Sequence, residues 1–263
     1  MRSRARLFRA ASALLLGAAL AACGAGSTAP SPSVTPAGAL TGPVTVFAAA
    51  SLTEAFNDDR ARLVAGNPTL ALSFSFAGSQ QLVAQVIGGA PADVVATADP
   101  GTMQKMVSVG AVEAPQTFAR NDLEIVVAPG NPKRVKGLAD LARGDLRVVL
   151  ADPAVPAGKY ARQALDRQGL SVSPVSLELD VKSELQKVVG GEADAGIVYV
   201  TDVKSAASRA SGVAIPPDQN VVTMYPVAVV RASAHHAAAQ AFVDQLLSGA
   251  GRDALRAQGF LSP

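Results

Sequence analysis

The chain has 263 residues, of which 49% are apolar and none is tryptophan. This length and composition suit one large or two modest α/β domains with an aliphatic core. Four arginines lie within the first nine positions without any acid, so the formal charge of +2 becomes −2 once that segment is removed. The folded part therefore has no broad basic field for nucleic acid, and any anion must be bound by a local arrangement of donors.

Residues 1–22 have the organisation of a secretory signal peptide. A basic start precedes an apolar run around Leu14-Leu15-Leu16, which is too short to span a membrane. The run ends at Leu20-Ala21-Ala22-Cys23, which resembles the bacterial lipobox, and this resemblance implies a diacylated Cys23 at the mature N-terminus. A free cysteine after an ordinary signal is the alternative. Cys23 is the only cysteine, so no intrachain disulfide can form.

Residues 23–42 are predicted to be a flexible tether between the lipidated cysteine and the folded part. The segment consists almost entirely of glycine, alanine, serine, threonine and proline. Such a composition offers too little apolar surface to fold. We therefore expect the folded part to begin near Pro43 and the protein to be held by lipid at the outer face of the plasma membrane.

The first predicted strand ends at a serine that begins a helix. Residues 44–47 form a short apolar, β-branched run, and Leu52, Phe56 and Leu63 follow at near-helical spacing. Ser51, with Glu54 three positions later, fits a capping box. A serine at a helix N-terminus is also a suitable anion ligand, because free N–H groups and the helix dipole point there. Ser51 on its own therefore fits either role.

The next predicted strand and helix repeat this arrangement around Ser79. Residues 70–76 alternate between apolar and small residues, which is typical of a strand. Gly78 and Ser79 follow, and a helical apolar stripe then ends at Gly88-Gly89. Ser79 fits an ordinary helix cap as well as a ligand.

The rest of the chain continues to alternate strands with helices. The strands are predicted at 93–98, 123–128, 146–150, 175–179, 195–200 and 221–230, and the helices at 100–109, 138–142, 157–168, 181–189, 237–247 and 252–258. Such alternation implies mainly parallel sheets flanked by helices. The β-rich segments near 123 and 227 suggest two crossings between lobes, so we expect lobe I at 43–123 and 227–263 and lobe II at 124–226. A ligand would then bind in the cleft between the lobes.

Three further positions in the second predicted lobe offer hydrogen-bond donors. Ala157, within Pro156-Ala157-Gly158, and Val181, after Asp180, lie in the first turns of helices, where backbone N–H groups lack helical partners. Tyr199 ends a predicted strand and adds a phenol, although a core tyrosine would fit there too. A fully ionised oxyanion has only acceptor oxygens, so a site made of neutral donors holds it and rejects protonated competitors.

Several motifs, in chain order, resemble the periplasmic molybdate-binding protein of ABC transporters. They are Val-Phe-Ala-Ala-Ala-Ser-Leu-Thr (46–53), Phe-Ala-Gly-Ser (76–79), Gly-Ala-Pro-Ala-Asp-Val (89–94), Asp-Pro-Ala-Val-Pro-Ala-Gly-Lys-Tyr-Ala (152–161), Gly-Ile-Val-Tyr (196–199) and Tyr-Pro-Val-Ala-Val-Val (225–230). The resemblance implies a type II-like periplasmic-binding fold whose lobes close over molybdate or tungstate and deliver it to an importer. It also implies a permease and an ATPase as partners and no cofactor, since the oxyanion is the ligand. We expect the protein to be a monomer.

The resemblance also implies which residues contact the oxyanion. Ser51 would bind through its hydroxyl and amide, Ser79 through its hydroxyl, and Tyr199 through its phenol. Ala157 and Val181 would donate backbone N–H groups. The second motif departs from relatives that are richer in serine, because Gly78 precedes Ser79 and Gln80 follows it.

Three other functions compete with this interpretation. An enzyme is disfavoured because the sequence has no Gly-x-Ser-x-Gly elbow and no metal-ligand spacing. A binding protein for another tetrahedral oxyanion such as sulfate is the closer alternative, since sulfate differs from molybdate chiefly in size. A purely structural lipoprotein is the third. Asp93 and Asp99 are expected to be structural, and His235-His236 is expected to be a solvated surface pair.

Overall fold

The computed structural model describes residues 40–263. The predictions for the signal peptide and for Cys23 lie outside the described residues, as does the prediction for all but the last part of the tether. Among residues 40–263, no helix is both long and apolar enough to cross a membrane.

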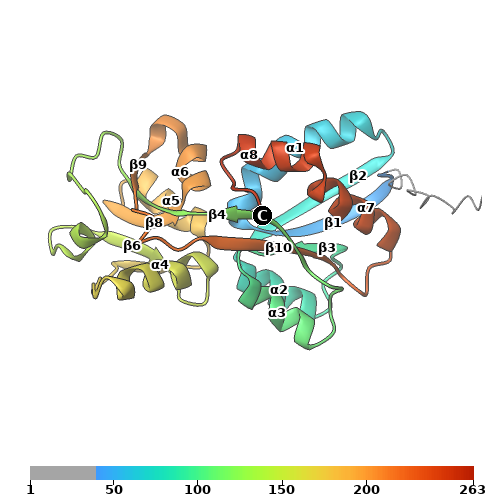
Figure 1. The fold of residues 1–263 in the computed structure, drawn as a ribbon, viewed down its shortest axis with the longest axis horizontal. Helices are drawn as coiled ribbons and strands as arrows, with labels where there is room; N and C mark the ends of the chain where they lie inside the picture. Colours follow the sequence, from blue (N-terminus) through green and yellow to red (C-terminus); the bar gives the residue numbers. More distant parts are fainter. Residues whose placement is uncertain (1–39) are drawn as a thin grey trace, which may run out of the picture. The chain divides into compact units, whose positions relative to one another are not determined.

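Ten strands form two five-stranded sheets, which Figure 1 shows side by side. The first sheet has the order β2-β1-β3-β10-β4, with β1 (Gly42–Ala49), β2 (Leu70–Ala77), β3 (Val94–Ala96), β4 (Gln116–Asn121) and β10 (Thr223–Val229). The second has the order β7-β6-β8-β5-β9, with β5 (Leu123–Val127), β6 (Val148–Ala151), β7 (Ser176–Glu178), β8 (Ala195–Tyr199) and β9 (Ser211–Ala214). Each sheet is the centre of one lobe.

The chain passes between the two sheets twice. It leaves the first sheet after β4 and enters the second at β5, with only Asp122 between them. It returns between β9 and β10, so that residues from Thr223 onward pair within the first sheet. The exact lobe limits, expected at 123/124 and 226/227, stay a prediction.

Both sheets are mixed, whereas the alternation of strands and helices led us to expect mainly parallel ones. In the first sheet, β1 runs parallel to β2 and β3, but β10 runs antiparallel to β3 and β4. In the second, β6 runs parallel to β7 and β8, but β5 runs antiparallel to β8 and β9. The strands that follow the crossings, β5 and β10, are the ones that reverse direction, because each enters its sheet from the other lobe and not through a helical crossover.

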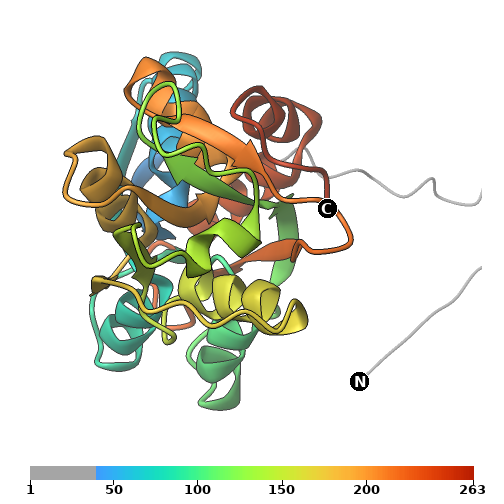
Figure 2. The same cartoon turned by 90° about the vertical axis from the view of Figure 1, so that its left-hand side faces the viewer.

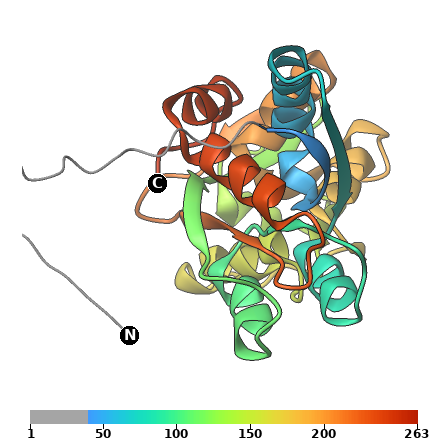
Figure 3. The ribbon, with the colours of Figure 1, turned by 90° about the vertical axis from the view of Figure 1, so that its right-hand side faces the viewer.

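Helices cover both faces of each sheet. The first lobe contains the 3₁₀ turn η1 (Ala50–Leu52) and the helices α1 (Thr53–Gly66), α2 (Ser79–Ile87), α3 (Pro100–Ser108), α7 (His236–Leu247) and α8 (Gly249–Ala257). Figure 3 shows α1 and α7 on one side of the first sheet and α2 and α3 on the other. Along β1, Val46 faces the α1 and α7 side with Phe56 and Phe242, whereas Phe47 packs with Leu82 on the opposite side. This alternation is the two-residue period of a strand that is buried on both faces.

The second lobe has the same layered construction. It contains α4 (Pro156–Arg167), α5 (Val181–Val189), α6 (Val200–Ala206) and the 3₁₀ turns η2 (Leu138–Ala142) and η3 (Ala207–Arg209). Figure 2 shows α4, in yellow, below the second sheet and α6, in orange, above it. The helices α4 and α5 follow β6 and β7 along the chain, and the N-terminal residues of both lie close to residues of the first lobe.

Candidate anion-binding site

A small cavity lies between the two lobes at the starts of four helical segments. The first lobe contributes Ala49, Ala50, Ser51, Gly78, Ser79 and Ala98, and the second contributes Val155, Pro156, Ala157, Asp180, Val181 and Tyr199. The cavity volume is about 10 Å³, the space of about one water molecule. Clefts that hold drug-sized molecules measure roughly 300–1,000 Å³. The cavity between the lobes therefore excludes organic solutes.

All five residues that the sequence selected line this one cavity. They are Ser51, Ser79, Ala157, Val181 and Tyr199. They come from five separate segments of the chain, and each is less than 5% exposed. The structure thus brings the candidate residues together, while their contact with a ligand stays a prediction.

The predicted capping box at Ser51 is wrong. Ser51 lies inside the 3₁₀ turn that precedes α1, and its side chain does not cap the helix. The hydroxyl of Thr53 donates to the carbonyl of Ala50 at 2.7 Å instead. Glu54 reaches away from the turn, and its carboxylate lies 2.6 Å from the ammonium of Lys182 in the other lobe. The additional 3₁₀ turn moves Ser51 one step into the helical segment, so the geometry of an N-cap serine is lost.

The side chain of Ser51 instead contacts a tyrosine from the last strand of the sheet. The Ser51 Oγ lies 2.9 Å from the Tyr225 Oη, and both residues are buried. Tyr225 was part of a motif in the sequence, but it received no role there. A tyrosine on an apolar strand gives no sequence signal that separates a packing residue from one whose hydroxyl touches a ligand-binding residue.

The hydroxyl of Ser79 is oriented by the neighbouring strand end. Gly78 is the N-cap of α2, and Ser79 is its first residue. The Ala98 N–H donates to the Ser79 Oγ at 3.0 Å. Because a backbone N–H can only donate, the serine oxygen is the acceptor here, and its own proton is free to point at a ligand.

Ala157 and Val181 occupy the first turns of α4 and α5. Ala157 follows Pro156, the first residue of α4, and its N–H belongs to the helix start, where no intrahelical acceptor exists. Val181 is the first residue of α5, after the N-cap Asp180. The Asp180 carboxylate accepts from the Ser183 N–H at 2.8 Å and from its hydroxyl at 2.9 Å. Because that carboxylate is engaged by its own helix, the N–H groups dominate this side of the cavity.

Tyr199 provides a phenol without a partner. Its side chain is buried, and its hydroxyl has no hydrogen-bond partner among the described residues. Burial raises the pKa of Tyr199 well above its usual value, so the phenol remains protonated at any physiological pH. A buried hydroxyl without a hydrogen-bond partner lowers the stability of the fold unless a ligand accepts a hydrogen bond from it. Its position in the cavity therefore fits an acceptor ligand.

Two lysines near the cavity are neutralised by carboxylates. The ammonium of Lys159 lies 3.0 Å from Asp99, and that of Lys182 lies 2.6 Å from Glu54 and 2.9 Å from Asp202. Burial alone would lower the pKa of Lys182, but Asp202 and Glu54 hold it above its usual value. Each lysine belongs to the second lobe and meets an acid of the first. The cavity itself is left with neutral donors.

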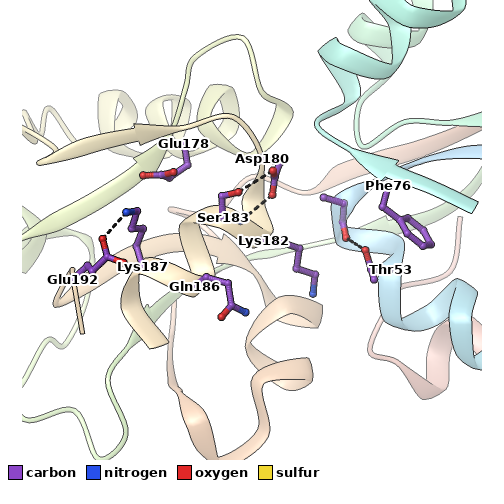
Figure 4. Close-up of a pocket in the computed structure, with 10 residues that line it drawn as sticks. Thr53, Phe76, Glu178, Asp180, Lys182, Ser183, Gln186, Lys187 and Glu192 are labelled. Atoms are coloured by element: carbon purple, nitrogen blue, oxygen red, sulfur yellow. Dashed lines mark hydrogen bonds and ion pairs between the residues drawn. The ribbon is translucent and has the colours of Figure 1, made fainter. Parts of the chain in front are cut away.

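An open groove adjoins the cavity. Figure 4 shows Thr53 and Phe76 of the first lobe on one side of it and Asp180, Lys182 and Ser183 of the second on the other. The groove shares Ala50 and Asp180 with the cavity, so the two are neighbours.

The other polar residues that the sequence singled out have structural contacts. Asp99 caps α3 by accepting from the Thr102 N–H at 2.6 Å, and Asp93 accepts from the Thr45 N–H at 2.7 Å. His235 lies 3.2 Å from Asp93 at the surface. Within residues 40–263, no group of three or more histidine, cysteine, aspartate or glutamate side chains is placed to hold a metal ion.

Two lobes that enclose a small, donor-lined cavity define a solute-binding protein. The chain belongs to the bacterial extracellular solute-binding protein family, which matches residues 44–261. One relative that aligns with nearly the whole chain is the molybdate-binding protein ModA of Mycobacterium tuberculosis. It is 42% identical over 250 residues, and the alignment covers 95% of each chain. The resemblance to periplasmic molybdate-binding proteins is thereby confirmed.

Solved structures confirm the fold. The periplasmic molybdate-binding protein of Azotobacter vinelandii is 20% identical, with a TM-score of 0.72 over 84% of this chain and 99% of the other. The sulfate-binding protein SubI of Mycobacterium tuberculosis is also 20% identical, with a TM-score of 0.74 over 83% of this chain and 86% of the other. At this identity the likeness concerns the two-lobed fold and carries no information on the ligand.

Proposed function

We propose that this protein captures molybdate or tungstate between its lobes and delivers it to an ABC importer. One observation carries the proposal: the cavity between the lobes is lined by hydroxyl and N–H donors, and the buried hydroxyl of Tyr199 has no other partner. The close relationship to a molybdate-binding protein supports this choice of ligand.

Each of the five residues has a role in this proposal. Ser51 donates through its hydroxyl and its amide, and Ser79 and Tyr199 donate through their hydroxyls. Ala157 and Val181 donate backbone N–H groups from helix N-termini, where the helix dipole also favours an anion. A dianion with four acceptor oxygens satisfies these donors, whereas a protonated anion would bring an O–H without an acceptor.

The proposal extends to the place and partners of the protein. Cys23 carries the lipid that holds the mature protein at the outer face of the plasma membrane, and the residues between Cys23 and β1 link it to the lobes. The protein acts as a monomer, meets a permease and its ATPase, and catalyses no reaction. The oxyanion is cargo and not a resident cofactor.

Sulfate is the second candidate ligand. It has the same shape and charge as molybdate, and a sulfate-binding protein shares the fold. Discrimination must then come from size, because both ions offer four acceptor oxygens to the same donors. The two ligands can be separated by direct comparison.

Thermal unfolding tests the proposal. A ligand that binds only the native state stabilises it, so molybdate or tungstate at about 100 times its dissociation constant should raise the melting midpoint by roughly 5–10 °C. Sulfate at the same concentration should give a much smaller increase. An equal increase with sulfate would contradict the ligand specificity, and no increase with any of the three anions would favour a purely structural lipoprotein.

A further inference from the structure

Tyr225 contacts the candidate site without lining its cavity. It lies on β10 and is fully buried, with its ring edge-to-face against Phe118 and Phe260. Its hydroxyl ends 2.9 Å from the Ser51 Oγ, across 174 residues of sequence. The contact therefore joins the last strand of the first sheet to the 3₁₀ turn at the first junction.

Only one direction of this hydrogen bond leaves Ser51 able to bind an anion. A serine hydroxyl has a single proton. If the Ser51 hydroxyl donates its hydrogen bond to Tyr225, its oxygen presents only lone pairs to the cavity and repels an oxyanion. If Tyr225 is the donor instead, the Ser51 O–H is free to donate to the ligand.

The surroundings of Tyr225 favour donation from the tyrosine. Burial raises the pKa of Tyr225, so its proton is retained. A phenol is more acidic than an aliphatic hydroxyl and is therefore the better hydrogen-bond donor of the pair, which makes the Ser51 Oγ the acceptor.

Ser79 shows the same arrangement with no ambiguity. The Ala98 N–H donates to the Ser79 Oγ and leaves the serine proton free. Both serines line the same cavity, and within residues 40–263 each has one buried neighbour hydrogen-bonded to its oxygen. In one case the neighbour is an obligate donor, and in the other it is a phenol that can take either role.

We propose that Tyr225 is a positioning residue that donates to the Ser51 oxygen and thereby fixes the Ser51 hydroxyl as a donor to the bound oxyanion. This inference rests on the proposed role of Ser51 in binding. It adds a specificity function, because a Ser51 hydroxyl whose O–H is directed at the ligand favours an acceptor oxygen there over the O–H of a protonated anion.

A double-mutant cycle on the full-length protein tests the inference. Molybdate affinity is measured by calorimetry for the wild type, Tyr225→Phe, Ser51→Ala and the double variant. We expect Tyr225→Phe to weaken binding about ten-fold, as the loss of one hydrogen bond in a charged site implies. In the Ser51→Ala background the same change should have no further effect, because it acts through Ser51.

Controls separate this role from packing. Tyr160→Phe removes a phenol hydroxyl from a residue that does not line the cavity, and it should bind molybdate as the wild type does. The melting midpoint of each ligand-free variant reports any loss of folding. A second measurement uses inorganic phosphate, which retains a proton near neutral pH. Its affinity relative to molybdate should rise in Tyr225→Phe, since the Ser51 hydroxyl is then free to rotate and accept a hydrogen bond from the phosphate O–H.

Any other outcome of the double-mutant cycle contradicts one step of the inference. Equal losses from Tyr225→Phe in both backgrounds would make Tyr225 a packing residue only, and an unchanged affinity would remove its role. Unchanged binding in Ser51→Ala would remove the residue through which it acts. A wild-type protein that binds no molybdate would contradict the proposed function itself, whereas wild-type binding with additive losses contradicts this inference alone.

Discussion

Glu184 is a buried carboxyl group that lies outside the ligand cavity. It belongs to α5, and one of its oxygens accepts from the Ile197 N–H at 2.7 Å. Its second carboxylate oxygen has no partner among the described residues. Burial raises the pKa of Glu184 well above 4.5, and the nearby Asp202 and Glu178 raise it further.

The pKa of Glu184 predicts a loss of stability as the pH rises. The unfolded chain releases this proton near pH 4.5, whereas the folded protein retains it to higher pH. Between the two pKa values the folded state binds more protons, so the free energy of unfolding falls with rising pH, by about 1.4 kcal/mol for each unit that separates them. Glu184→Gln keeps the acceptor for Ile197 and should flatten the curve above pH 4.5.

Denaturant unfolding at a series of pH values measures this effect. The same substitution at the exposed Glu192 serves as the control and should leave the pH dependence of the wild type in place. A Glu184→Gln curve that falls as steeply as the wild type would show that Glu184 does not cause the loss.

Single residues of the site differ in how far the sequence predicted them. Ser51, Ser79 and Tyr199 could be selected because each stands where a strand pattern ends. The capping role of Ser51 could not be excluded, since the 3₁₀ turn that moves it into the helical segment leaves no trace in the residue pattern. Tyr225 could not be selected at all, because its partner lies 174 residues away in the chain.

The start of α4 approaches the end of β6 so closely that it requires glycine. A Cβ at Gly158 would meet the carbonyl oxygens of Ala151 and Asp152. Both obstacles are backbone atoms, which cannot move aside as a flexible side chain would. This contact sets the position of Ala157, which lines the cavity.

Gly158→Ala should therefore destabilise the protein and weaken binding. Alanine in place of glycine favours a helix by about 1 kcal/mol, but overpacking against fixed atoms costs roughly 1–3 kcal/mol. The clash wins, so we expect a lower melting midpoint, together with a loss of molybdate affinity as the Ala157 amide moves. Gly144→Ala is the matched control, because nothing lies within 4 Å of a Cβ at that position. Equal midpoints for the two variants would contradict the packing argument.

The positions of strands and helices were predicted better than the directions in which the strands pair. The strand and helix starts at both serine junctions follow from local patterns of apolar residues and glycine. The antiparallel entry of β5 and β10 depends on where the chain crosses between lobes, which is a long-range property. A rule based on alternating strands and helices therefore gave the correct layers but overestimated parallel pairing.

At the scale of the whole molecule, polar contacts join the two lobes around the cavity. The ion pairs Glu54–Lys182 and Asp99–Lys159 cross between them, and the Gln80 side chain donates to the carbonyl of Leu179 at 2.8 Å. Partly exposed pairs of this kind contribute little free energy each, so these polar contacts by themselves hold the lobes together weakly. We infer that the energy of closure comes chiefly from the bound oxyanion.

The backbone of Gly78 lies close to the second lobe at this interface. A Cβ at this position would meet the carbonyl oxygen of Leu179 and the side chain of Gln80. The backbone of Gly78, at φ −59° and ψ 136°, is open to any residue. The motif at residues 76–79 has glycine at position 78, where related motifs are richer in serine. Gly78 has no side chain and so leaves room for the Gln80 side chain to reach the other lobe.

Gly78→Ala should block closure without harming either lobe. The ligand-free melting midpoint should stay near the wild-type value, because the clash exists only when the lobes are together. Molybdate affinity should fall at least about ten-fold, as overpacking by one methyl group implies. Small-angle scattering should show a ligand-induced decrease in radius of gyration for the wild type and none for the variant. Gly66→Ala, where a Cβ meets nothing within 4 Å, should behave as the wild type. A Gly78→Ala protein that binds and compacts normally would mean that the lobes do not need this close approach to hold the ion.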